Sequence, residues 1–191
     1  MISAAVALEQ TERWLAEFVI GLNLCPFAGR PFKNGRVRIV VSTAASEQAL
    51  TADWLSEGEA LLAMPAVEVE TTLVVHPFVL QRFPDYNDYL WAANERLVEQ
   101  GWEGELQLAS FHPDYQFAGE GPHAASNYTN RSPYPMLHLI REDSLERALQ
   151  NFDNPEEIPQ RNIELMEKLG AEQLRSQLLG YQNENGSHDD A

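Results

Sequence analysis

The chain has 191 residues, of which 44% are hydrophobic, and 29 acidic against 13 basic side chains give it a formal net charge of −16. The length suits one globular domain, and a strongly negative chain repels phosphate backbones and anionic lipid, so we expect no nucleic-acid and no membrane partner. No apolar run has the length of a transmembrane helix. A single cysteine, Cys25, excludes an intrachain disulfide, so we expect a cytoplasmic protein.

The first half of the chain reads as a helix followed by strand–helix units. Apolar residues spaced three and four apart predict a helix over 11–22, and prolines and glycines predict a loop over 23–35. Short β-branched runs predict strands over 37–42 and 70–77. Further helices are predicted over 46–63 and from an N-cap at Asp85 to about Gln100.

The second half contains two more predicted strands, 106–112 and 136–142, separated by a long segment without regular periodicity. Start signals at Asp143 and Asn154 predict helices, and a last helix is expected to end near Tyr181. Residues 182–191 read as a frayed polar tail. We therefore predict a single α/β domain over residues 1–181.

The element order predicts one mixed four-stranded sheet with helices on its faces and an N-terminal helix first. Strand–helix–strand units favour a parallel central pair with right-handed crossovers. A ferredoxin-like α+β sandwich is the alternative fold.

The strongest candidate for a functional site is the loop from His112 to Pro135. Unstructured loops longer than about 12–15 residues are uncommon in compact domains and are usually functional or disordered. His112 with Asp114 could act as an acid–base pair. His76 also closes a strand before a proline, so both histidines are expected at one sheet edge, where they could share a metal with Asp114. The alternative is structural: histidines bonded to turn backbone, in a loop that covers the end of the sheet.

A predicted ligand-binding set surrounds Arg131, whose planar guanidinium suits a carboxylate or phosphate. Asn127, Asn130 and Tyr115 supply further hydrogen-bonding side chains from the same loop. Arg30 is predicted to converge with Arg131 on one concavity. The alternative is that Arg131 is a structural tie to a carboxylate.

Cys25 lies directly before a basic cluster formed by Arg30, Lys33, Arg36 and Arg38. Neighbouring positive charge could lower its pKa and make it a nucleophile, with its side chain on the wall of the predicted pocket. The alternative, a cysteine packed under the first helix, is the commoner fate of this residue type. His138, between two leucines in a strand, reads as structural.

Five blocks carry a resemblance to a known family: GLNLCPFAG, ETTLVVHP with DYNDYL, LASFHPDYQFAG, NYTNRSPYPMLHLIRE and IPQRNIELMEKLG. In this order, from about Glu12 to Gly170, they resemble a bacterial family known only as domain of unknown function fourteen-fifteen. The resemblance implies a small, cytosolic, stand-alone protein. It supplies no catalytic residues and no cofactor.

Three classes of function follow from these observations. The first is an enzyme that acts on a small anionic metabolite, with His112 and Asp114 as acid–base groups, Arg131 and Arg30 as an anion clamp, and Cys25 and His76 nearby. The second is a non-catalytic binding or regulatory module whose acidic helices after Glu142 face a basic partner, with the 112–135 loop as architecture. The third is a metal-binding protein. An enzyme needs a concave pocket where His112 and Arg131 converge, whereas a binding module needs an exposed apolar patch.

Overall fold

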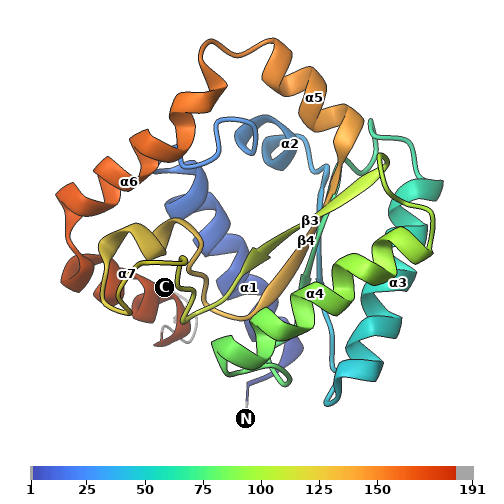
Figure 1. The fold of residues 1–191 in the computed structure, drawn as a ribbon, viewed down its shortest axis with the longest axis horizontal. Helices are drawn as coiled ribbons and strands as arrows, with labels where there is room; N and C mark the ends of the chain where they lie inside the picture. The colour runs from blue at the N-terminus through green and yellow to red at the C-terminus, as the bar shows by residue number, and fades with distance from the viewer. Residues whose placement is uncertain (1, 184–191) are drawn as a thin grey trace, which may run out of the picture.

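The computed structural model describes residues 2–183 and has one sheet, with helices before, between and after its strands (Figure 1). The elements are, in chain order, α1 (Ala4–Arg13), the π-helical η1 (Trp14–Ile20), α2 (Gly29–Lys33), β1 (Val37–Val41), α3 (Glu47–Ala63), β2 (Thr71–Val75), α4 (Phe83–Glu99), β3 (Leu106–Phe111), the 3-10 turn η2 (Ala125–Thr129), β4 (Met136–Arg141), α5 (Glu142–Gln150), the 3-10 turn η3 (Pro155–Glu157), α6 (Ile158–Leu169) and α7 (Ala171–Asn183).

The four predicted strands form one mixed sheet, as expected, in the order β1-β2-β4-β3. β1 and β2 pair in parallel, and β4 pairs antiparallel with β2 and with β3. The predicted parallel central pair is wrong, because the chain returns from β3 without a crossover helix and β4 runs back between β2 and β3. The element order also differs from the βαββαβ order of a ferredoxin-like sandwich.

Both crossover helices, α3 and α4, cover the same face of the sheet (Figure 1). The two crossovers lead in one direction across the sheet, so a common hand places both helices on one side. Trp54 of α3 and Tyr86 of α4 are fully buried there against Leu137 and Leu139 of β4. Burial of a large apolar side chain contributes roughly 1.5–3 kcal/mol, so this layer is a main source of stability.

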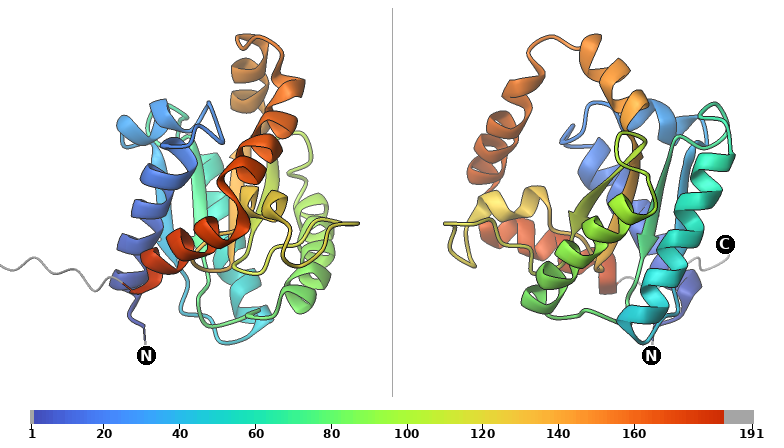
Figure 2. Two further views of the ribbon diagram at one scale, coloured as in Figure 1. Left: turned by 90° about the vertical axis from the view of Figure 1, so that its left-hand side faces the viewer. Right: turned by 45° about the vertical axis from the view of Figure 1, so that its right-hand side comes forward.

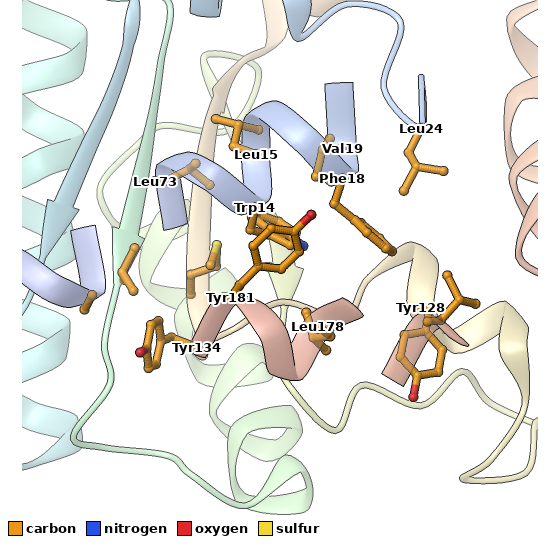
Figure 3. Packing of buried hydrophobic residues seen from close by; sticks show 14 of the residues in the cluster. Trp14, Leu15, Phe18, Val19, Leu24, Leu73, Tyr128, Tyr134, Leu178 and Tyr181 are labelled. Atoms are coloured by element: carbon orange, nitrogen blue, oxygen red, sulfur yellow. The ribbon is translucent and has the colours of Figure 1, made fainter. Parts of the chain in front are cut away.

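The opposite face carries α1, η1 and α7, with part of α6 (Figures 2 and 3). In Figure 3, Trp14 and Phe18 of η1 and Leu178 and Tyr181 of α7 lie together in one cluster with Leu73 of β2. Each of these side chains is buried. This second core holds the N-terminal and C-terminal helices together.

The first helix starts earlier than predicted and changes character along its length. Ser3 caps it, since its Oγ accepts a hydrogen bond from the N–H of Val6 at 3.2 Å. After Arg13 the helix continues as the π-helical η1, and the N–H of Gly21 bonds to the carbonyl of Ala16 at its end. A Cβ on Gly21 would lie 2.1 Å from the carbonyl oxygen of Glu17, so the sequence needs glycine here.

Three other helix starts differ in detail from the predictions. α4 begins at Phe83 rather than after a cap at Asp85, because Pro84 has the backbone angle that a first helical turn requires. Asp85 instead lies in the first turn, where a negative charge is favourable. α5 begins at Glu142 without a side-chain cap from Asp143, and Asn154 precedes η3 with a left-handed φ of 52°.

Two remaining expectations concern the chain end and the membrane. The first two residues of the predicted tail, 182 and 183, belong to α7, and the rest of it, from residue 184 onward, lies outside the described residues. Among the helices that are described, none has the length and apolar character that crossing a membrane would require.

Candidate functional site

The two strand-ending histidines lie at the same edge of the sheet, as predicted. β2 and β3 run in the same direction, and His76 and His112 follow their last residues directly. The ring of Tyr86 contacts both, with centroid distances of 5.7 Å to His76 and 5.1 Å to His112. Phe83 and the loop residue Tyr115 extend this aromatic cluster, with 5.1 Å between their ring centroids.

His76 is completely buried, and its surroundings fix its tautomer. Its Nδ1 lies 3.1 Å from the carbonyl oxygen of Val79, so Nδ1 must carry the proton and donate it. Nε2 therefore bears a lone pair, and that atom is buried without a hydrogen-bond partner. Burial lowers the pKa of His76 to about 4, and the neighbouring His112 adds to this effect, so the ring is neutral at pH 7.

His112 is also buried, and both of its ring nitrogens bond to backbone. Nε2–H donates to the carbonyl oxygen of Leu80 at 3.1 Å, and Nδ1 accepts from the backbone N–H of Asp114 at 2.9 Å. Burial is the main reason why the pKa of His112 is lowered. The contact with Asp114 is thus made by its main chain, and no ring nitrogen of His112 is left to exchange a proton with a ligand.

The two histidines together hold the turn that follows β2. His76 bonds to Val79 and His112 bonds to Leu80, which has a left-handed φ of 58°. A non-glycine residue in this conformation costs of order 1 kcal/mol or more and persists only where its surroundings enforce it. This is the structural role that the sequence left open as the alternative.

The long loop after His112 is held by hydrogen bonds within itself and to β3. Asn127 is fully buried; its Oδ1 accepts from the N–H of Phe117 at 3.0 Å, and its Nδ2 donates to the carbonyl of Gly121 at 2.8 Å. Asn130 Nδ2 donates to the carbonyl of Ser110 in β3 at 3.2 Å. Both predicted ligand-binding asparagines are therefore engaged in loop structure.

Arg131 has its guanidinium occupied by the same loop. Nε donates to the carbonyl of Tyr115 at 3.1 Å and a terminal nitrogen donates to the carbonyl of Pro122 at 2.7 Å. The guanidinium carbon also lies 4.6 Å from the ring centroid of Tyr128, which is a cation–π distance. Arg131 is a tie, as in the structural alternative, but its partners are backbone carbonyls and not a carboxylate.

Cys25 and Arg30 lie away from this edge. Arg30 is exposed on α2, near the start of β1, whereas Arg131 follows η2 at the edge where β3 ends (Figures 1 and 2). Cys25 is partly buried against the core beneath η1. Burial raises the pKa of its thiol, and the backbone N–H groups of Phe27 and Ala28 offset only part of this. The structure therefore does not bring Arg30 together with Arg131.

The basic cluster after Cys25 is also partly neutralised. Arg36 pairs with Glu70 at 2.9 Å, and Arg38 pairs with Glu57 at 2.8 Å. The strength of this cluster as an anion site, or as an activator of the thiol, is reduced accordingly.

Two hollows on the described surface lie elsewhere. One, of about 470 Å³, is bounded by the α5–α6 connection and the first turns of α6; the other, of about 510 Å³, adjoins the α6–α7 junction at Gly170. The first is lined by three carboxylates, Asp153, Glu157 and Glu164, and by Arg161. None of the predicted site residues lines either hollow, and among residues 2–183 no three His, Cys, Asp or Glu side chains gather to hold a metal.

Two residues that the sequence did not identify as functional candidates are exposed or partly exposed in the structure. His138 is only partly buried although it lies in an internal strand, and Trp91 on α4 is 75% exposed. The only sequence signal for His138 was the alternation of side chains in β4, which places it on the face opposite Leu137 and Leu139. Trp91 lies on the predicted helix three residues after Asp88, but the sequence did not show which side of that helix is buried. In the structure the buried residues of α4 lie on the opposite side, so Trp91 is exposed.

Comparison with known proteins gives a family and nothing more specific. A family model described as "Protein of unknown function (DUF1415)" matches residues 6–176. Neither the curated proteins nor the solved structures yield a match. The matched range includes every strand and every predicted site residue, so the resemblance seen in the sequence is confirmed. The chain belongs to the DUF1415 family of proteins of unknown function.

Proposed function

We propose that this protein is a non-catalytic binding module that docks a basic protein segment on the exposed face of α4. The enzyme hypothesis requires His112 and Arg131 to converge on a pocket, but backbone groups occupy both side chains and neither residue lines the two hollows described above. The alternative requires an exposed apolar patch, and α4 offers one. A cytoplasmic setting is part of the proposal, since Cys25 is a free thiol.

The observation that carries the proposal is the exposure of Trp91. This side chain is 75% exposed, and Val98, two turns further along, is 54% exposed. Asp88 lies one turn before Trp91, and Glu95 lies between Trp91 and Val98. Both are exposed, and spacings of three and four place all four residues on one stripe of the helix. The buried side of α4 points the opposite way, and Figure 1 shows the helix on the outside of the molecule.

The charge of this stripe indicates which partner it fits. α4 carries four acidic residues and one base, Arg96, which pairs with Glu99 at 2.7 Å. A second copy of a chain with a net charge of −16 would bring like charges together, and nucleic acid is repelled by the same field. A segment that alternates Lys or Arg with apolar residues complements both the carboxylates and the Trp91 ring. The 17 residues of α4 give a contact line of about 25 Å, which is long enough for a partner helix.

Trp91 also provides the assay, because the other three tryptophans, Trp14, Trp54 and Trp102, are buried. Fluorescence that acrylamide quenches readily should therefore come mainly from Trp91. We expect an amphipathic Lys/Leu helical peptide to shift the emission to the blue and to protect it from acrylamide. A Glu/Leu peptide of the same length should do neither.

Substitutions connect this signal to the stripe. In calorimetry with the Lys/Leu peptide, Trp91→Ala should weaken binding on the order of thirtyfold, as expected for a central aromatic anchor worth about 2 kcal/mol. Leu179→Ala, on the exposed side of α7, is the matched control and should bind like the wild type. Equal affinity of Trp91→Ala and wild type, or equal binding of the acidic and basic peptides, would exclude α4 as the docking surface.

A further inference from the structure

A second surface with unmatched polar groups lies on the sheet, on the face opposite α3 and α4. β4 is an internal strand, so full cover is expected on both of its faces. Leu137 and Leu139 are completely buried on the α4 side, yet His138 and Ile140 on the other side are partly exposed. Ala109, the cross-strand neighbour of His138 in β3, is also partly exposed.

The arrangement of the helices explains why this half of the sheet is only partly covered. α1 packs against β1, while α6 packs mainly against η2 and α7 rather than on β3 and β4 (Figure 2). The α5–α6 connection passes outside the strands, as both views in Figure 2 show. Ala109, which pairs with His138 across β3 and β4, has only a methyl side chain.

The hydrogen bonds of Thr71 determine which nitrogen of His138 carries the proton. Thr71 Oγ1 donates its only proton to the carbonyl of Leu139 at 2.6 Å. The 2.5 Å contact between Thr71 Oγ1 and His138 Nε2 must then be a bond in which Nε2–H donates. Nδ1 consequently holds a lone pair. No described group bonds to Nδ1, and it is not among the fully buried unpartnered atoms, so it retains some exposure to solvent.

Aromatic groups border this lone pair. The ring of Phe111, on the same face, lies 6.3 Å from the ring of His138 at an interplanar angle of 41°. Trp14 packs edge-on against Phe111, with 5.6 Å between their ring centroids, and its buried indole N–H has no hydrogen-bond partner among the described residues. The acceptor of His138 and the buried, unpartnered donor of Trp14 thus lie near the same aromatic ring, and of the two only the His138 nitrogen is accessible from solvent.

Loss of hydration on this sheet lowers the pKa of His138 to about 4, so the ring is neutral and Nδ1 remains an acceptor at pH 7. An ionised carboxylate offers only acceptor oxygens, and carboxylates and phosphates are both repelled by the net charge of −16. Arg141, the nearest base along β4, is on the other face, where it bonds to the backbone carbonyls of Leu61 and Met64 at the end of α3.

We propose that the open face of β3 and β4 binds a small planar nitrogenous molecule, uncharged or cationic, whose N–H donates to His138 Nδ1 while its ring packs beside Phe111. The ligand class is a heteroaromatic amine or an amidine. The site differs from the strand-edge cluster of His76 and His112 and from the α4 stripe, so it stands or falls independently of the protein-docking proposal.

Benzamidine and benzoate form a matched pair of probes, since they have nearly the same size and ring but opposite charge and hydrogen-bonding character. In protein labelled with 15N-histidine, titration with benzamidine should shift the Nδ1 resonance of His138 in a saturable way. Benzoate should leave it unchanged. The resonances of the fully buried His76 and His112 serve as internal references in the same spectrum.

Variants test whether His138 itself makes the contact. His138→Phe keeps a flat ring and should weaken benzamidine binding at least tenfold. Thr71→Val has nearly the shape of threonine but removes the acceptor for Nε2–H, so the tautomers mix and binding should weaken less. A saturable benzamidine shift that benzoate does not reproduce would support the site even if His138→Phe fails to fold.

Three results would overturn the proposal. One is the absence of any His138 shift at saturating benzamidine, and a second is equal binding of benzoate. The third is a His138 shift that depends on protein concentration without any probe, because a second copy of the chain would then cover this face.

Discussion

The buried histidines predict a specific dependence of stability on pH. His76 has a pKa of about 4 in the folded chain, against 6.5 for an ordinary histidine. Below pH 6.5 the unfolded chain therefore binds a proton that the folded chain does not, and the stability that the neutral ring contributes is lost as the pH falls toward 4. Between pH 7 and pH 5 this one residue should lower the free energy of unfolding by about 2 kcal/mol.

Replacement of His76 by asparagine isolates that contribution. The amide nitrogen of Asn lies close to the position of Nδ1 and can still donate to the carbonyl of Val79, but it cannot titrate. His76→Asn will change the stability at pH 7 through packing. The informative quantity is therefore the difference between pH 7 and pH 5 within each protein, which should be about 2 kcal/mol smaller in the variant than in the wild type.

Urea unfolding at pH 7, 6 and 5, followed by circular dichroism, measures these free energies. Acidification also relieves the repulsion within a chain of net charge −16, which opposes the histidine effect equally in both proteins and cancels in the comparison. His123→Asn, at an exposed histidine of the loop, is the control and should follow the wild type. Parallel pH profiles for His76→Asn and wild type, within about 0.5 kcal/mol, would refute the argument that His76 is held neutral by burial.

Three further predictions concern contacts that the sequence did not reveal. Tyr86→Phe should cost about 2–4 kcal/mol in urea unfolding, because its hydroxyl donates to the first carbonyl of β4 and accepts the last N–H of β3; Tyr115→Phe, in the same aromatic cluster but without a hydroxyl partner, should be near neutral. Gly21→Ala should cost about 1–3 kcal/mol, since its Cβ would meet a carbonyl oxygen at 2.1 Å, and an unchanged melting temperature would show that the π-helical end relaxes freely. Arg131→Ala should lower the melting temperature by about 2–6 °C and phosphate should not protect the wild type, while Arg30→Ala leaves it unchanged; strong protection by phosphate would instead revive the anion site.

The strands and the sheet were predictable because their signals are local. Each strand is a short apolar run bounded by turn residues, and the observed ranges, such as Val37–Val41 and Met136–Arg141, fall within the predicted ones. The order of the strands was not predictable from the sequence, because the insertion of β4 between β2 and β3 depends on pairing between distant segments. The start of the first helix was missed because Ser3 and Ala4 precede the apolar stripe that defined it.

The shared sheet edge of His76 and His112 was predictable for a topological reason: each directly follows one of two strands that run in the same direction. Their roles were not predictable, because the partners are carbonyl oxygens of Val79 and Leu80. Every residue has such an oxygen, so no residue type marks it in the sequence. The same holds for Arg131, whose acceptors are two loop carbonyls where the sequence suggested a carboxylate.

The distribution of hydrogen-bonded and ion-paired bases explains why both proposed surfaces take donors and cations rather than anions. Thirteen bases face 29 acids. Most of the thirteen are already engaged with carboxylates or backbone oxygens: Arg13, Arg36, Arg38, Arg82, Arg96 and Arg147 with acids, and Arg131, Arg141 and Arg161 with carbonyls. Within the described chain this leaves Arg30 and Lys33 on α2, Lys168 on α6 and Arg175 on α7, on three separate helices. An anion site would need several of these cations gathered against the field of the whole protein. A basic segment over Trp91, or an N–H donor at His138, gains from that same field and meets an acceptor or an aromatic ring that no other group satisfies.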